Sequence, residues 1–154
     1  MKPELTEVLR EASTVVLETM FFADVSTVAV EEPVHDDPLA CSLLCSGAEN
    51  GSFTVAVDRA ALGMLSEAFY GDDGESSSTR EAELLCELTN MLAGSTLSTY
   101  APNHYCPLSS PKVCDFAQHL ATVSSSAPDE HKTSISLALD GGLLSVSCTL
   151  KAAA

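Results

Sequence analysis

The sequence predicts an α+β fold, in which a mainly antiparallel sheet packs with two long helices and a shorter one. Three segments repeat apolar residues at helical spacing, and the last third holds two runs that alternate polar and apolar residues in period two. A helix followed by a hairpin occurs once in each half of the chain. We therefore expect a pseudo-symmetric domain, although no repeat is visible residue by residue.

The first helix is expected over about residues 4–20. Pro3 suits its start, because the first turn of a helix does not use the N–H that proline lacks. Early glutamates lie near the positive end of the helix dipole. The apolar positions that recur at helical spacing are Leu5, Val8, Leu9, Ala12, Val15, Val16 and Met20.

A hairpin and a shorter helix are expected next, after an acidic loop over 31–38 that is broken by two prolines. Residues 39–46 and 52–57 flank Gly-Ala-Glu-Asn-Gly, which is typical of a turn between two strands. Asp58 is a suitable cap for a helix over about 59–70.

The second half begins with a turn-rich connection over 71–78. A third helix is expected to start at a Ser78 or Thr79 cap and to end near Tyr100. An irregular connector holds two prolines and leads to a strand over about 113–123 and a loop over 124–130. Residues 131–139 and 143–151 alternate in period two around Asp-Gly-Gly, which predicts a hairpin. One domain over 1–151 and an unpatterned tail over 152–154 are expected.

The composition excludes several kinds of partner. The chain has 154 residues, with 7 Lys+Arg against 22 Asp+Glu and a net charge of −15. Nucleic acids and anionic membrane surfaces are disfavoured, because both need a patch of lysine and arginine. Since 45% of the residues are hydrophobic, we expect a folded domain with an acidic surface that favours a partner with a basic face.

A cytoplasmic location is expected, because the charged N-terminus lacks the apolar core of a signal peptide and no apolar run reaches about 20 residues. The cysteines are expected to be buried free thiols rather than a disulfide framework. They are Cys41, Cys45, Cys86, Cys106, Cys114 and Cys148. No metal site is expected, since the spacing of His104, Cys106, Cys114 and His119 matches no standard zinc motif.

The third helix has an unusual polar face opposite its leucines. Glu83, Glu87, Asn90 and Gly94 lie at i, i+4, i+7 and i+11, so they share one side. Asparagine and glycine both disfavour a helix interior, which suggests that this face meets another molecule. The alternative is that the polar residues are ordinary surface residues and Gly94 is a close contact between helix and sheet.

The two central side chains suggest a chemistry. The Asn90 amide has one acceptor and two donors, so it can hold and aim a water molecule. The Glu87 carboxylate only accepts, and it can pair with a lysine or arginine. Gly94 would let the backbone of a partner come close. Together they could insert into the active site of another protein and align a hydrolytic water there.

Three segments resemble a known family. Glu87-Leu-Thr-Asn90-Met-Leu-Ala-Gly94 resembles the E-x-x-N signature of the CheC/CheX chemotaxis phosphatases, with Cys86 where the family often has a small residue. Residues 12–20 resemble the first CheX helix, and residues 108–113 resemble its S-x-P-x-V segment. With the final hairpin, the resemblance covers most of the chain in order and implies a CheC/CheX-like domain.

The resemblance implies a phosphatase that acts on the phosphoaspartate of a CheY-like response regulator. Asn90 would orient the in-line water, Glu87 would pair with the regulator's lysine, and Glu83 and Gly94 would contact the partner. Mg²⁺ is expected on the phosphorylated partner, so the chain would need no cofactor of its own. The first helix lacks asparagine at the places of a second signature, which matches the single-site CheX branch.

Other interpretations stay open at this stage. CheX proteins tend to be homodimers, but nothing in these residues establishes that state. The same fold could be a non-catalytic adaptor that binds a response regulator or a flagellar-switch component. It could also be a structural dimerisation domain whose polar helical face has no function.

Overall fold

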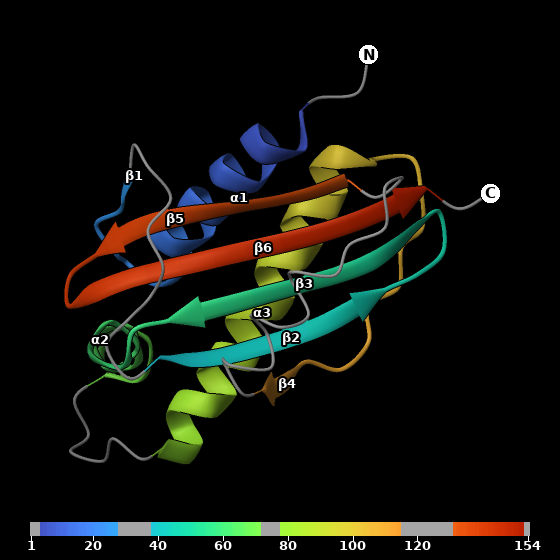
Figure 1. Cartoon of the computed structure of the whole chain (residues 1–154). Helices are drawn as coiled ribbons and strands as arrows, with labels where there is room; N and C mark the ends of the chain where they lie inside the picture. The colour runs from blue at the N-terminus through green and yellow to red at the C-terminus, as the bar shows by residue number, and fades with distance from the viewer. Residues whose placement is uncertain (1–3, 28–37, 72–77, 115–130, 153–154) are drawn as a thin grey trace.

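The computed structural model describes residues 4–27, 38–71, 78–114 and 131–152 (Figure 1). Within these ranges, three helices and six strands follow one another along the chain. They are α1 (Leu5–Met20), β1 (Ser26–Thr27), β2 (Leu39–Cys45), β3 (Glu49–Val57), α2 (Arg59–Tyr70), α3 (Ser78–Tyr100), β4 (Lys112–Cys114), β5 (His131–Leu139) and β6 (Gly142–Ala152).

The strands form one antiparallel sheet in the order β1-β5-β6-β3-β2-β4. Each half of the chain supplies a helix, a short edge strand and a hairpin, and each edge strand pairs with the hairpin of the other half. If the corresponding strands of the two halves are exchanged, the same strand order is obtained, read from the opposite edge of the sheet. The predicted α+β fold and its pseudo-symmetry are therefore confirmed.

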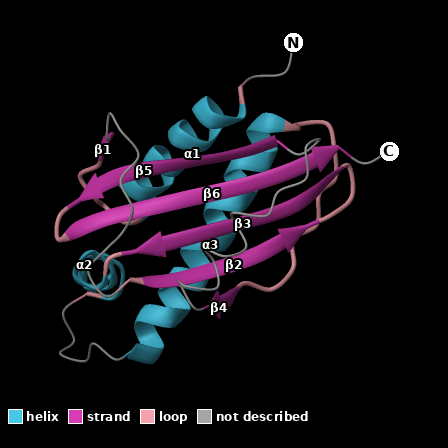
Figure 2. Cartoon of the chain, viewed as in Figure 1, coloured by secondary structure: helices cyan, strands magenta, loops and turns pink. Residues whose placement is uncertain are grey.

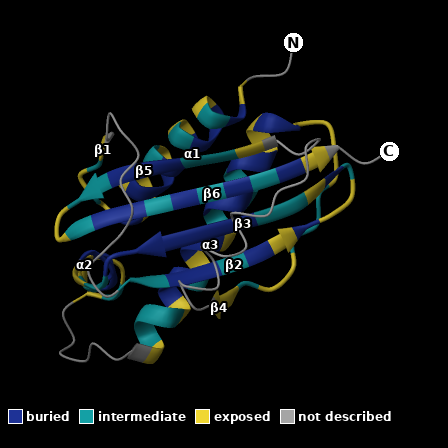
Figure 3. Cartoon of the chain, viewed as in Figure 1, coloured by how far each residue is buried: buried dark blue, intermediate teal, exposed yellow. Residues whose placement is uncertain are grey.

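Helices α1 and α3 cover one face of the sheet, and α2 lies at one end of it (Figures 1 and 2). Strand β6 shows how the core forms, because its residues alternate between the two faces. The residues that face the helices are buried and belong to the core, and Figure 3 shows this band. They are Leu144, Val146, Cys148 and Leu150.

Helix α1 has the predicted extent, but its buried stripe differs from the expected one. Val15 and Met20 were expected in it, yet they are 51% and 47% exposed. Ser13 and Leu17 are buried instead. The stripe continues the i, i+3, i+4 spacing from Leu5 through Leu17, so Val15 and Met20 fall on the other side of the helix.

An unusual backbone conformation follows the C-terminus of α1. Phe22 has φ +54°, in the left-handed region that glycine usually occupies after a helix, and it is 77% exposed. The Leu17 carbonyl accepts hydrogen bonds from the N–H groups of both Phe21 and Ala23, at 3.2 and 3.1 Å. This ending turns Phe21 into the core while the ring of Phe22 stays outside.

Asp58 precedes α2 as predicted, but its side chain does not cap the helix. Its Oδ2 accepts a hydrogen bond from Leu143 N at 2.8 Å, and its own N–H donates to Leu143 O at 3.0 Å. A Cβ at Gly142, where φ is +154°, would lie 2.7 Å from the Asp58 side chain. The aspartate side chain therefore fixes the start of β6 and does not cap the first turn of α2.

Other boundaries also differ from the expectations. The first hairpin has a shorter turn, because β3 already begins at Glu49. Glu49 pairs with Ala152, so β6 enters the expected tail. The edge strand β1 was not predicted. Strand β4 covers only the start of the predicted strand over 113–123. The rest of that strand and the loop over 124–130 lie outside the described residues. The same is true of residues 31–37 in the acidic loop and 72–77 in the connection.

The left-handed backbone at Phe22 predicts a stabilising substitution. Phe22→Gly is expected to raise the free energy of unfolding by about 1 kcal/mol, because glycine adopts this conformation without a steric penalty. Urea-induced unfolding measures the change. Phe22→Ala removes the ring but keeps the penalty, so equal stability of the two variants would contradict the explanation.

Candidate functional site

Helix α3 separates a leucine stripe from a polar face. Leu84, Leu85, Leu88 and Leu92 are buried against the sheet and α1, and Met91, expected among them, is half-buried. The expected polar face points outward. Glu83, Glu87 and Asn90 are exposed and Gly94 is half-buried. The need to bury the leucines thus forces these residues to the surface.

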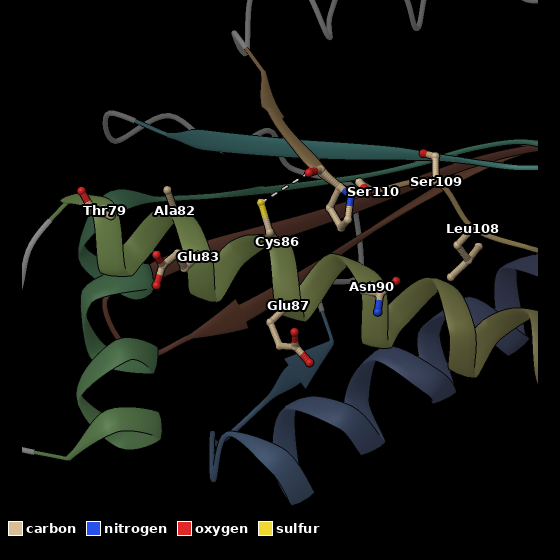
Figure 4. A pocket seen from close by; sticks show the side chains of 10 residues that line it. Thr79, Ala82, Glu83, Cys86, Glu87, Asn90, Leu108, Ser109 and Ser110 are labelled. Carbon is tan, nitrogen blue, oxygen red and sulfur yellow. Dashed lines mark hydrogen bonds between the residues drawn. The ribbon is translucent and has the colours of Figure 1, made fainter.

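A hollow of about 570 Å³ lies between α3 and the segment that precedes β4 (Figure 4). In Figure 4 the Cys86 side chain points from α3 toward this segment, whereas Glu87 and Asn90 lie further round the helix. We call this hollow the groove. It is lined by Thr79, Ala82, Glu83, Cys86, Glu87, Asn90, Leu108, Ser109, Ser110 and Pro111.

The second wall of the groove, residues 108–111, is held by the edge of β2. Leu44 N donates to Ser109 Oγ at 2.9 Å, and Ser109 N donates to Leu44 O at 2.8 Å. Leu108 forms a β-bridge with Cys45. The connector that the sequence left irregular is therefore fastened to the sheet, and its prolines keep it from joining as a regular strand.

The groove brings two family-like segments together. The E-x-x-N segment provides Glu87 and Asn90 on one wall, and the segment resembling S-x-P-x-V provides Ser109 and Pro111 on the other. They lie about 20 residues apart in the sequence. Helical spacing could not show this neighbourhood, because it depends on the pairing of β4 with β2.

Two polar side chains on the groove wall are available to bind another molecule. Within the described ranges, Glu87 and Asn90 make no hydrogen bond or ion pair. Among the described residues, the groove lining contains two glutamates and no lysine or arginine. An external cation would therefore meet uncompensated carboxylates beside an amide that can both donate and accept.

Gly94 lies just beyond the groove. It lines a second hollow of about 220 Å³, and Leu108 lines both. A Cβ at Gly94 would meet no side chain or neighbouring element within 4 Å, so the alternative of a close helix–sheet contact is wrong. The glycine leaves a gap on the exposed face that an approaching chain could fill.

Cys86 is a groove residue that the sequence analysis did not single out as part of the site. Ala82, Cys86 and Asn90 recur every four residues, which is the signal that could have placed Cys86 on the groove side of α3. Cys41, Cys45 and Cys148 are buried free thiols, as predicted. Cys86 and Cys106 are also free but half-buried, and the Cys114 side chain lies outside the described residues.

The described residues contain neither a candidate metal site nor a helix that could span a membrane. In these ranges no group of three His, Cys, Asp or Glu side chains could hold a metal ion, and His119 falls outside them. None of the helices in the described part of the chain has the length and apolar character that a membrane crossing needs.

Known structures with the same architecture identify the fold. A putative chemotaxis protein from Desulfovibrio vulgaris Hildenborough superposes with a TM-score of 0.76 and 18% identity over 97% of both chains. CheX from Vibrio vulnificus gives 0.75 and 13%, over 98% of this chain and 99% of that one. CheX from Borrelia burgdorferi, solved with CheY, BeF3 and Mg²⁺, gives 0.74 and 15%, over 96% and 98%. This chain has the CheX/CheC fold.

The sequence itself matches no family model and no curated protein. The internal symmetry of the fold extends to its two long helices. Buried positions in 8–17 of α1 coincide with those in 84–93 of α3. This alignment places Glu11 opposite Glu87 and Thr14 opposite Asn90, so the equivalent face of α1 has the carboxylate without the amide.

The open space at Gly94 predicts the effect of adding a methyl group. Gly94→Ala is expected to stabilise the protein by about 1 kcal/mol, because alanine favours the helix and meets no neighbour. Gly63→Ala in α2 is a matched control, since its Cβ also meets nothing within 4 Å. Urea-induced unfolding tests both, and a loss of stability confined to Gly94→Ala would contradict the open geometry.

Proposed function

We propose that this protein dephosphorylates the phosphoaspartate of a CheY-like response regulator. The observation that carries the proposal is the unpartnered Glu87–Asn90 pair on the wall of an open groove. The shared fold with a CheX that was solved in complex with CheY, BeF3 and Mg²⁺ supports the choice of partner. The acidic composition suits a partner with a basic site.

Asn90 would position the attacking water. Its carbonyl can accept a hydrogen bond from the water while its NH₂ donates to the phosphoryl group. The water oxygen attacks phosphorus as the bond to the aspartate oxygen breaks, which releases inorganic phosphate, a proton and the free carboxylate. Positioning and electrostatics supply most of the catalysis in such a transfer, so one well-placed amide is sufficient.

Glu87 would fix the register between the two proteins. One turn before Asn90, its carboxylate can pair with the lysine beside the phosphoaspartate. Glu83 extends the acidic face by another turn, and Gly94 lets the partner's backbone approach the other end of the same face. Mg²⁺ would be bound by the regulator, and the groove contributes only protein groups.

The catalytic proposal predicts a specific loss of activity. Asn90→Ala is expected to slow dephosphorylation of the regulator about 100-fold, because the water loses its orientation. The time course of phosphate release measures this, with circular dichroism to verify the fold. Asn50→Ala, which removes an exposed asparagine from β3, is the control and should keep full activity.

Binding experiments separate catalysis from docking. Glu87→Gln is expected to weaken regulator binding about tenfold through loss of one charge-assisted hydrogen bond, whereas Glu67→Gln on α2 leaves it unchanged. Gly94→Ala should weaken binding and Gly63→Ala should not. If the wild type binds regulators but never accelerates phosphate release, the adaptor interpretation replaces the phosphatase. If none of the α3 variants changes either property, the polar face has no such role.

A further inference from the structure

Two thiols meet where the groove wall joins the core. The sulfur atoms of Cys41, in β2, and Cys86, in α3, lie 3.5 Å apart, and the Cys41 thiol donates to the Cys86 sulfur. Cys41 is fully buried, whereas Cys86 is half-buried and lines the groove. The Cys86 thiol also donates a weak hydrogen bond to Pro111 O on the opposite wall, at 3.9 Å. The dashed line in Figure 4 marks this contact.

We propose that Cys41 and Cys86 are a reversible redox pair, in which Cys86 reacts with a hydroperoxide and Cys41 resolves the product as a disulfide. A disulfide needs its sulfurs at about 2.05 Å, so the pair must close by about 1.5 Å. An accessible thiol beside a resolving cysteine is the arrangement of redox-sensing sites. The two residues are 45 positions apart and come from different layers, so the bond would join helix to sheet.

The reaction has two balanced steps. The Cys86 sulfur attacks one oxygen of the hydroperoxide, the O–O bond breaks, and Cys86 becomes a sulfenic acid as water or an alcohol leaves. The Cys41 sulfur then attacks the Cys86 sulfur and displaces hydroxide, which leaves as water with the Cys41 proton. Two thiols are oxidised and one peroxide is reduced. A dithiol reductant reverses the change by thiol–disulfide exchange.

Two of the three other described thiols are less suited to start this reaction. Burial raises the pKa of the Cys45 thiol to about 11, and burial also raises the pKa of Cys148, so both stay protonated at neutral pH. Cys106 is half-buried and lines the second hollow. It is therefore the competing site for the first step.

The bond would change the groove. Cys86 directly precedes Glu87, so drawing its sulfur toward β2 shifts this turn of α3 and removes the thiol from Pro111 O. Strand β2 also holds the other wall through Leu44 and Ser109. If the protein is the phosphatase proposed above, on which this consequence alone rests, oxidation slows dephosphorylation at least fivefold and a dithiol restores it.

Mass spectrometry of the intact protein tests the pair without any partner. Treatment with hydrogen peroxide is expected to lower the mass by about 2 Da, and dithiothreitol should reverse the loss. Cys106→Ala should retain the loss, whereas Cys86→Ala and Cys41→Ala should abolish it. Because Cys86 lies at the groove surface, its variant gives the answer even if Cys41→Ala fails to fold. No loss of mass in the wild type would overturn the proposal.

Digestion identifies the bond. Chymotrypsin cuts after Leu44, between Cys41 and Cys45, and after Tyr100, between Cys86 and Cys106. A linked fragment that joins residue 41 to residue 86 supports the pair. A link between residues 45 and 106, or stable oxygen addition at Cys86 without a link, would overturn it.

The rate of dephosphorylation is measured in a separate experiment. Peroxide should slow the wild type and leave Cys41→Ala insensitive. A mapped Cys41–Cys86 bond in a protein without phosphatase activity would refute the proposed function and leave the redox pair intact. A mapped bond in an active protein whose rate does not change would overturn the regulatory consequence.

Discussion

The pairing of β3 with β6 is the constraint on which the rest of the structure depends. It joins the hairpins of the two halves over nine residue pairs, from Glu49 with Ala152 to Val57 with Leu144. The alternate pairs place buried apolar side chains beneath the helices. A shift by one residue would turn these side chains to the other face, so the register is strongly specified. Asp58 and Leu143 close one end of this pairing with two hydrogen bonds.

The sheet in turn sets the orientation of α3. This helix of 23 residues packs on the inner face with its leucines, and the opposite face must then meet solvent wherever α1 does not cover it. The groove forms because β2 also binds the segment before β4, alongside the helix. Strand β2 therefore positions both walls, and Cys41 within it contacts Cys86 on the groove wall.

Sequence periodicity was sufficient for the elements whose pattern is local. The bounds of α2 and α3 and the last hairpin were predicted closely, because long amphipathic runs leave little choice of structure. Strand β1 could not be predicted, since two residues carry no period. The side-chain contact of Asp58, the second groove wall and the Cys41–Cys86 neighbourhood arise from strand pairing between distant segments. The polar face of α3 and the chemistry of its side chains were predicted from spacing and residue type, but the partner and the reaction came from the resemblance.

The internal symmetry allows the polar face of α3 to be compared with the equivalent face of α1. Helices α1 and α3 share one pattern of buried positions, so both pack against the same sheet with side chains at equivalent positions. At the position that corresponds to Gly94, α1 has Glu18. Glutamate favours a helix over glycine by roughly 0.5 kcal/mol or more. At the position of Asn90, α1 has Thr14. Packing in this fold therefore requires neither an amide nor a missing side chain there. Since both residues weaken α3 and neither binds another described residue, contact with a second molecule is the simplest reason for them.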